Sequence, residues 1–322
     1  MKYQMARRHL IFTIVFLFSC FGIFAIMFEL RLMDFHPFCY KKEEFEYFFD
    51  SGTVNSTFLM LPKIDCKTEP PYLVILITTT PNQQKARMAI RDTWGKERWI
   101  GDKRVVAYFL LGTTQIGRKE EYSLAVERHM YKDFIQKDFI DVYSNLTYKT
   151  LMGLEWINHY CPETSFVMKT DTDMFVNPVY LVQKLLEKNQ TTNLFTGFLK
   201  LNEFPIRIKS SKWYTSIEEY PKDRYPPFCS GTGYVFSVDV AQKIYQISGI
   251  VPFFKLEDVY IGLCLEKIEI RLQEFHNQQL FYPEKPPFSV CSYRNIVTSH
   301  GFLPHEIQMY WEAMERADDE EC

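Results

Sequence analysis

The chain has 322 residues, of which 47% are hydrophobic and 16% aromatic, so it can bury a large core and is not a disordered protein. Its formal net charge of −3 at pH 7 argues against a nucleic-acid partner, because such a partner normally requires a basic face. The composition therefore predicts one catalytic domain with appendages, and it leaves small polar or sugar substrates open.

The N-terminus combines a short basic stretch with a long uncharged one. Residues 10–28 are nineteen mostly apolar residues that follow Arg7 and Arg8 and end before Glu29. A helix of this length spans about 28 Å, which is close to the hydrocarbon thickness of a bilayer. A cleaved signal peptide is the alternative, but its apolar run is usually shorter and ends at small residues. We predict a membrane anchor at 10–28, a cytosolic tail at 1–9 and a lumenal remainder.

The chain beyond the anchor divides into an irregular part and a periodic part. Residues 29–69 are mixed and poorly periodic, so we interpret them as a stem that precedes a catalytic domain at 70–322. In that domain the strand candidates are 72–78, 104–111, 134–142 and 165–169, and the helical stretches are 83–94, 119–131, 147–160 and 179–188. Their alternation predicts an α/β fold with a mostly parallel sheet, in which ligands bind beyond the carboxyl ends of the strands.

The glycosylation sequons and the cysteines agree with a lumenal location. Three N-glycosylation sequons begin at Asn55, Asn145 and Asn189. Seven of the eight cysteines follow the apolar run, and none has the close Cys and His spacing of a zinc site, so we interpret them as structural. The six from Cys66 onward could pair in fifteen ways, among which the sequence does not choose.

Two aspartates follow the strand candidate that contains Phe166. Asp171 and Asp173 are two residues apart, so on an extended backbone they share one face and can converge on one divalent cation. An aspartate-rich turn is the structural alternative. A phosphatase-like Asp-x-Asp pattern is disfavoured by Met174, and an aspartic protease would need glycine in place of Asp173. The pair predicts a metal-dependent active site, with the turn left open.

Two further motifs each have a structural and a functional interpretation: an acidic pair and a pair of glycines. Glu257 and Asp258 precede apolar residues around Gly262, and one acidic residue at such a place is ordinarily a helix cap. Two adjacent acids are one more than a cap needs. Gly231 and Gly233 precede an apolar strand, where they either admit a ligand close to the backbone or form a tight turn.

The remaining candidates are basic and aromatic. Arg87 and Arg91 are four apart and share a helix face, where either a diphosphate or solvent could contact them. His300 is a single histidine, which is more often packed or exposed than a ligand. Trp213 and Tyr214 lie before the glycine pair and could stack on sugar rings, with loop packing as the alternative.

These pieces, in this order, resemble the β-1,3-galactosyltransferase family of Golgi enzymes. The matching stretches are Arg87–Gly95, Phe139–Thr150, Phe166–Phe175, Phe195–Gly197, Tyr225–Tyr234 and Lys255–Cys264. The resemblance implies a single-pass type II membrane protein in the Golgi with a lumenal GT-A fold. It also implies UDP-galactose as donor, Mn²⁺ as cofactor, inversion at the anomeric carbon, and terminal GlcNAc or GalNAc of glycoproteins and glycolipids as acceptor.

The same resemblance assigns roles to individual residues. It implies that Asp171 to Asp173 bind the nucleotide sugar and metal, that His300 completes the metal site and that Asp258 is the general base. The expected donor contacts are Arg87, Arg91, Lys169, Asp171, Thr172, Asp173, Gly231 and Gly233, and the expected acceptor contacts are Trp213, Tyr214 and Glu257. A β-1,3-N-acetylglucosaminyltransferase would share the metal and base residues, and a non-catalytic lumenal sugar-binding protein is a further alternative.

Overall fold

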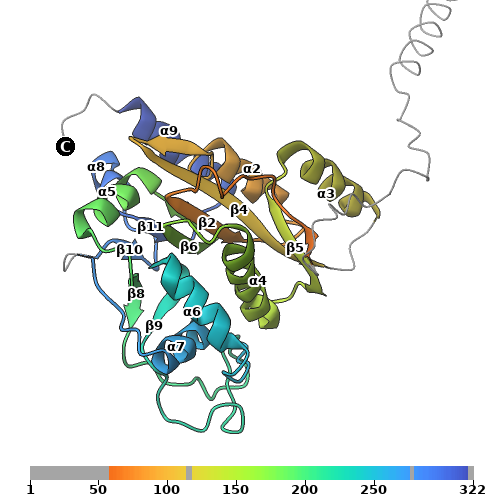
Figure 1. Cartoon of the computed structure of the whole chain (residues 1–322), viewed down its shortest axis with the longest axis vertical. Helices are drawn as coiled ribbons and strands as arrows, with labels where there is room; N and C mark the ends of the chain where they lie inside the picture. The colour runs from red at the N-terminus through yellow and green to blue at the C-terminus, as the bar shows by residue number, and fades with distance from the viewer. Residues whose placement is uncertain (1–57, 114–117, 276–278, 318–322) are drawn as a thin grey trace, which may run out of the picture. The chain divides into compact units, whose positions relative to one another are not determined.

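The computed structural model describes residues 58–113, 118–275 and 279–317 (Figure 1). The predicted tail, the predicted anchor at 10–28 and the sequon at Asn55 lie outside these residues. Among the residues that are described, no helix is long and apolar enough to cross a membrane.

An eight-stranded sheet forms the centre of the domain. Its strands are β1 (Phe58–Met60), β2 (Leu73–Thr78), β3 (Arg98–Ile100), β4 (Lys103–Thr113), β5 (Phe134–Ile140), β6 (Phe166–Asp171), β8 (Phe195–Lys200) and β9 (Phe228–Ser237). The strands β5, β4, β2 and β6 are parallel neighbours, whereas β1, β3, β8 and β9 pair antiparallel. The predicted strands are confirmed, but the sheet is mixed rather than mostly parallel. Antiparallel strands need no crossover helix, so the alternation of strands and helices did not reveal them.

A small three-stranded sheet, made of β7 (Met174–Val176), β10 (Phe281–Tyr282) and β11 (Thr298–His300), lies apart from the main one. The helices are α2 (Gln84–Asp92), α3 (Arg118–Tyr131), α4 (Leu146–Tyr160), α5 (Pro178–Lys188), α6 (Val238–Ser248), α7 (Glu257–Lys267), α8 (Val290–Arg294) and α9 (Pro304–Arg316). A short 3₁₀ helix, Tyr143–Asn145, precedes α4. The helices expected from the sequence are confirmed as α2 to α5.

Alternate residues of β2 supply two hydrophobic cores. Val74 and Leu76 belong to one core, which includes residues of α4, α6 and α7. Leu73, Ile75 and Ile77 belong to the other, which includes residues of α2, α5 and α9. Figure 1 shows these two sets of helices on opposite sides of the sheet. Burial on both faces explains why the sequence of β2 is continuously apolar.

The folded domain begins before the predicted boundary at residue 70. Phe58 of β1 is buried, and β1 pairs with β5. Cys66 forms a disulfide with Cys161, the residue that follows α4. Residues 58–69 therefore belong to the domain and not to the stem. The sequence did not show this, because a strand of three residues is too short to have a recognisable periodicity. Of the other cysteines, Cys291 is disulfide-bonded, whereas Cys229 and Cys264 are buried free thiols.

Candidate active site

A buried lysine organises the carboxyl end of β6. Lys169 Nζ donates to Asp171 Oδ1 at 2.8 Å and to the Gly231 carbonyl at 2.7 Å, and it lies 3.6 Å from Glu257 Oε2. The hydroxyl of Thr78, the last residue of β2, also donates to Asp171. Burial lowers the pKa of Lys169, but the neighbouring carboxylates outweigh burial and raise that pKa above its ordinary value. The lysine therefore stays charged and joins β6, β9 and α7.

Asp173 and His300 form the second polar pair of the site. His300 Nε2 lies 3.2 Å from Asp173 Oδ2, and His300 Nδ1 lies 3.1 Å from the Pro283 carbonyl. A carbonyl oxygen only accepts, so Nδ1 carries a proton, and when the ring is also protonated at Nε2 this second N–H donates to Asp173 Oδ2. The hydrogen bond to Asp173 raises the pKa of His300. The Asp173 side chain is 52% exposed and the His300 side chain is 36% exposed, so both are open to solvent.

The backbone fixes this pair in place. β11 pairs antiparallel with β7, and His300 stands opposite Met174, the residue after Asp173. The amides of Gly301 and Phe302 both donate to the Asp173 carbonyl, at 3.0 and 2.9 Å. Gly301 has a φ of +90°, which glycine adopts without strain. The chain reversal after β11 thus requires glycine at this position.

The two aspartates do not lie on one extended strand as the sequence predicted. β6 ends at Asp171, and Thr172 and Asp173 form a turn before β7, so the alternation of an extended strand stops there. Asp171 is held by Lys169, whereas Asp173 meets His300, and Thr172 is buried. Within the described part of the chain, no three or more His, Cys, Asp or Glu side chains form a cluster that could hold a metal ion. The turn that was left open as an alternative is therefore present.

Glu257, the first residue of α7, is enclosed by protein groups. It is 5% exposed, and its Oε1 accepts hydrogen bonds from Thr150 Oγ1 at 2.9 Å and from the Tyr234 hydroxyl. Lys169 lies near its other oxygen. The expected direct contact with the acceptor is therefore corrected: Glu257 positions the start of α7 and leaves no oxygen facing a substrate.

Asp258, the second residue of α7, is less enclosed than Glu257. Its side chain is half-buried, Oδ2 accepts the Gly231 amide at 3.3 Å, and Oδ1 accepts the Val259 amide at 2.9 Å. Burial raises the pKa of Asp258, although these amides oppose the shift. A raised carboxyl pKa makes a stronger base, and the two amides fix the orientation of the carboxylate.

Comparison with known proteins identifies the family to which this arrangement belongs. Residues 85–276 match the family model described as Galactosyltransferase. The chain is 48% identical to beta-1,3-galactosyltransferase 5 of Homo sapiens over 316 residues, which cover 98% of each chain. It is 42% identical to beta-1,3-galactosyltransferase 2 of Mus musculus over 260 residues, which cover 80% of this chain and 62% of the relative. The chain belongs to the galactosyltransferase family. It is an enzyme with a GT-A-like fold, as the resemblance predicted.

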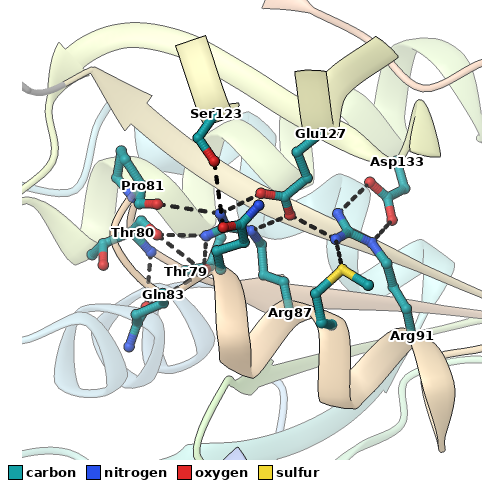
Figure 2. A network of polar contacts seen from close by, with 11 residues as sticks. Thr79, Thr80, Pro81, Gln83, Arg87, Arg91, Ser123, Glu127 and Asp133 are labelled. Atoms are coloured by element: carbon teal, nitrogen blue, oxygen red, sulfur yellow. Dashed lines mark hydrogen bonds and ion pairs between the residues drawn. The ribbon is translucent and has the colours of Figure 1, made fainter. Parts of the chain in front are cut away.

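Arg87 of this galactosyltransferase is fully buried. Figure 2 shows its guanidinium group among polar contacts with Glu127 and the Thr79–Pro81 segment. Its Nε and Nη2 donate to the two carboxylate oxygens of Glu127, each at 2.7 Å. Its other N–H groups donate to Thr79 Oγ1 and to the carbonyls of Thr80 and Pro81. An arginine has five N–H groups, so protein acceptors use all of them.

Arg91 continues the same network. It pairs with Glu127 at 2.6 Å and with Asp133 at 2.7 Å, and its guanidinium lies 4.0 Å from the ring centre of Tyr131. The direct donor contact expected of Arg87 is therefore corrected, because protein acceptors use all of its N–H groups. The donor contact expected of Arg91 stays a prediction. We assign the two residues to holding the β2–α2 loop, which follows the carboxyl end of β2.

This network predicts a large effect on stability. Glu127→Gln is expected to lower the free energy of unfolding by about 3–5 kcal/mol, because the buried Arg87 loses its counter-charge. Glu163→Gln makes the same chemical change at an exposed position and is expected to stay within about 0.5 kcal/mol of wild type. Urea unfolding of both variants measures the difference, and equal stabilities would contradict the role given to the network.

The glycines and aromatic residues belong to other elements than the arginine network. Gly231 and Gly233 are within β9 rather than before it, where Gly233 pairs with Thr170 of β6. Trp213 and Tyr214 belong to the long connection between β8 and β9, and Trp213 is 47% exposed. These positions are compatible with the predicted donor and acceptor contacts, which stay predictions.

Two of the sequons lie on the described surface. Asn189, the residue after α5, is exposed. Asn145 Nδ2 donates to the Ile140 carbonyl at 2.9 Å, and Thr147 of the same sequon is buried and donates to the Phe254 carbonyl. Occupancy of the sequons stays a prediction.

Helix α4 supplies two site residues that the sequence alone did not single out. Lys149 is 1% exposed, and its Nζ donates to Asp141 Oδ1 at 2.6 Å and to the Thr79 carbonyl. Thr150 donates to Glu257, which is 107 residues away. The sequence offered a signal for Lys149, because a lysine stands among the buried positions of α4. It offered no local signal for the role of Thr150.

Proposed function

We propose that the enzyme transfers galactose from UDP-galactose, with inversion, in β-1,3 linkage to terminal GlcNAc or GalNAc of glycoprotein and glycolipid glycans. The observation that carries the proposal is the difference between the two acids that begin α7. Glu257 is enclosed by Thr150, Tyr234 and Lys169, whereas Asp258 is partly exposed and oriented by two amides. One available base is what direct displacement by a sugar hydroxyl requires.

Asp258 is assigned to deprotonate the acceptor. A sugar hydroxyl is a poor nucleophile at neutral pH, so Asp258 takes its proton as the oxygen attacks the anomeric carbon of the donor. The bond between that carbon and the diphosphate oxygen breaks, and UDP leaves from the opposite side. No covalent enzyme intermediate forms, and the configuration inverts.

Asp173 and His300 are assigned to hold a divalent cation, which we propose to be Mn²⁺. A carboxylate and an imidazole are suitable ligands, both side chains are open to solvent, and the Pro283 carbonyl fixes the histidine tautomer as in many metal sites. When bound, the cation neutralises charge that develops on the departing diphosphate. Asp171, held by Lys169, is assigned to the nucleotide sugar.

We also propose the Golgi membrane as location, with the anchor at 10–28 and the catalytic domain in the lumen. The Cys66–Cys161 disulfide supports an oxidising compartment. Removal of N-glycans with an endoglycosidase is expected to increase the electrophoretic mobility of the cellular protein, which should remain with membranes after alkaline extraction. A protein without N-glycans, or one released by alkali, would contradict this location.

Donor choice is the direct test of the proposed activity. Turnover of UDP-galactose and UDP-GlcNAc should be compared with benzyl β-GlcNAc as acceptor. We expect product from UDP-galactose. Preference for UDP-GlcNAc would favour the β-1,3-N-acetylglucosaminyltransferase alternative, and sugar binding without any turnover would favour a non-catalytic protein.

A further inference from the structure

A cavity of about 240 Å³ lies beside the start of α7. Its lining includes Lys209, Lys212, Lys255, Tyr143, Tyr214 and Leu256. Leu256 directly precedes the acidic pair of α7, whereas no residue of β7 or β11 lines the cavity. The cavity therefore borders the proposed base and not the Asp173–His300 pair.

The lysines of this cavity carry positive charge that is only partly compensated. Lys255 is paired with Glu219 at 2.8 Å. Neither Lys209 nor Lys212 has a carboxylate partner among the residues that the structure describes; the Lys212 ammonium lies instead 4.5 Å from the ring centre of Trp213. Two unpaired ammonium groups on one rim attract an anion, and the lining itself contributes no carboxylate.

Tyr143 lines the cavity, and the charge of Asp258 acts on its hydroxyl. Burial raises the pKa of the Tyr143 hydroxyl, and the negative charge of Asp258 adds to the shift. The phenol therefore stays neutral. Its ring, with that of Tyr214, offers the flat apolar surface on which a sugar ring packs.

An arginine holds the loop that carries the lysines. The Nη1 of Arg207 donates to the carbonyls of Thr215 and Ser216, and its Nη2 donates to those of Tyr220 and Lys222. These four bonds fold residues 207–222 back on themselves. Lys209 and Lys212 are thus presented by an ordered loop, so less entropy is lost when they bind an anion.

We propose that this cavity is an acceptor subsite for an anionic substituent of the glycan, either a sulfate ester or a carboxylate, beside the hydroxyl that is galactosylated. The inference rests on the proposed function, because it takes Asp258 as the place where the acceptor reacts. Ammonium groups form charge-assisted hydrogen bonds to both kinds of anion. Lys209 and Lys212 supply them, and the tyrosine rings contact the sugar that carries the anion.

The test compares acceptors that differ in one charge. The full-length enzyme is assayed with UDP-galactose and benzyl β-GlcNAc, its 6-O-sulfate or its 6-O-carboxymethyl ether. The wild type is expected to show a kcat/KM about five- to tenfold higher for at least one charged acceptor, mainly through KM. Lys209→Ala/Lys212→Ala is expected to abolish this preference. Lys63→Ala/Lys85→Ala removes two charges at exposed positions outside the cavity lining and should keep it.

The outcomes separate the inference from the proposed function. A preference for the sulfate or for the carboxymethyl ether that depends on the two lysines identifies which anion the subsite takes. Equal use of all three acceptors, or a preference that survives the double substitution, overturns the subsite but leaves the transferase activity standing. A double variant whose KM rises for UDP-galactose with every acceptor places the lysines on the donor and also overturns the inference. No transfer to any acceptor overturns the proposed function itself.

Discussion

Asp258→Asn is expected to lower kcat by about 10²–10⁴, because an amide cannot take the proton of the acceptor hydroxyl. The amide oxygen still accepts the hydrogen bonds that Gly231 and Val259 donate to the carboxylate, so the start of α7 should keep its conformation. Donor affinity should change little. Initial rates at saturating UDP-galactose, with UDP binding measured by calorimetry, separate the chemical step from binding.

Glu257→Gln is the matched control for this experiment. It makes the same change one residue earlier, but Glu257 is buried among Thr150, Tyr234 and Lys169. We therefore expect its main effect on stability, and a smaller loss of kcat than for Asp258→Asn. An Asp258→Asn enzyme within a few-fold of the wild-type kcat would move the role of base to another residue.

The pH dependence of the reaction gives an independent check on Asp258. Burial raises the pKa of this carboxyl above the ordinary value of 3.8. A base works only when deprotonated, so kcat/KM should fall as the pH is lowered through the raised pKa. The acid limb is therefore expected above the range of an exposed aspartate, and it should be absent from the residual activity of Asp258→Asn.

Asp173→Asn is expected to abolish metal-dependent turnover. The substitution removes the charge that would hold the cation beside His300, while the Asp173 carbonyl keeps its bonds to Gly301 and Phe302. A chelator should silence the wild type, and Mn²⁺ should restore it better than Ca²⁺, because a compact site disfavours the larger ion. Asp102→Asn, at an exposed turn between β3 and β4, is the control and should keep activity.

Binding of Mn²⁺ can be followed without turnover. The electron paramagnetic resonance signal of free Mn²⁺ decreases when the ion binds protein. Wild type and Asp102→Asn should reduce this signal equally in the presence of UDP, and Asp173→Asn should reduce it much less. Full activity in the presence of a chelator would contradict the metal assignment.

The parts of this fold that the sequence predicted are those with local patterns. β2 is apolar throughout because helices cover both of its faces, and α2 to α5 show helical periodicity. β1 was assigned to the stem, because a three-residue strand has no period to read. β8 was not predicted, and only the apolar end of β9 was, because this antiparallel pair at the sheet edge has no crossover helix between its strands.

In the candidate site too, the sequence predicted what local motifs show and missed contacts between distant elements. Asp258 and His300 were assigned by resemblance, but the sequence could not show that Glu257 faces inward, since its partners Thr150, Tyr234 and Lys169 come from other elements. The donor role of Arg87 was wrong for a similar reason. Its counter-charge, Glu127, is 40 residues away on α3, and no short pattern links the two.

The linkage and anomeric configuration of the product test the central claim most directly. The full-length enzyme should be incubated with UDP-galactose, Mn²⁺ and benzyl β-GlcNAc, and the purified disaccharide analysed by nuclear magnetic resonance. Direct displacement assisted by Asp258 predicts a β-galactosyl residue on the 3-oxygen of GlcNAc, recognised by the large coupling of its anomeric proton. An α-galactosyl product, or transfer to another oxygen, would contradict the account.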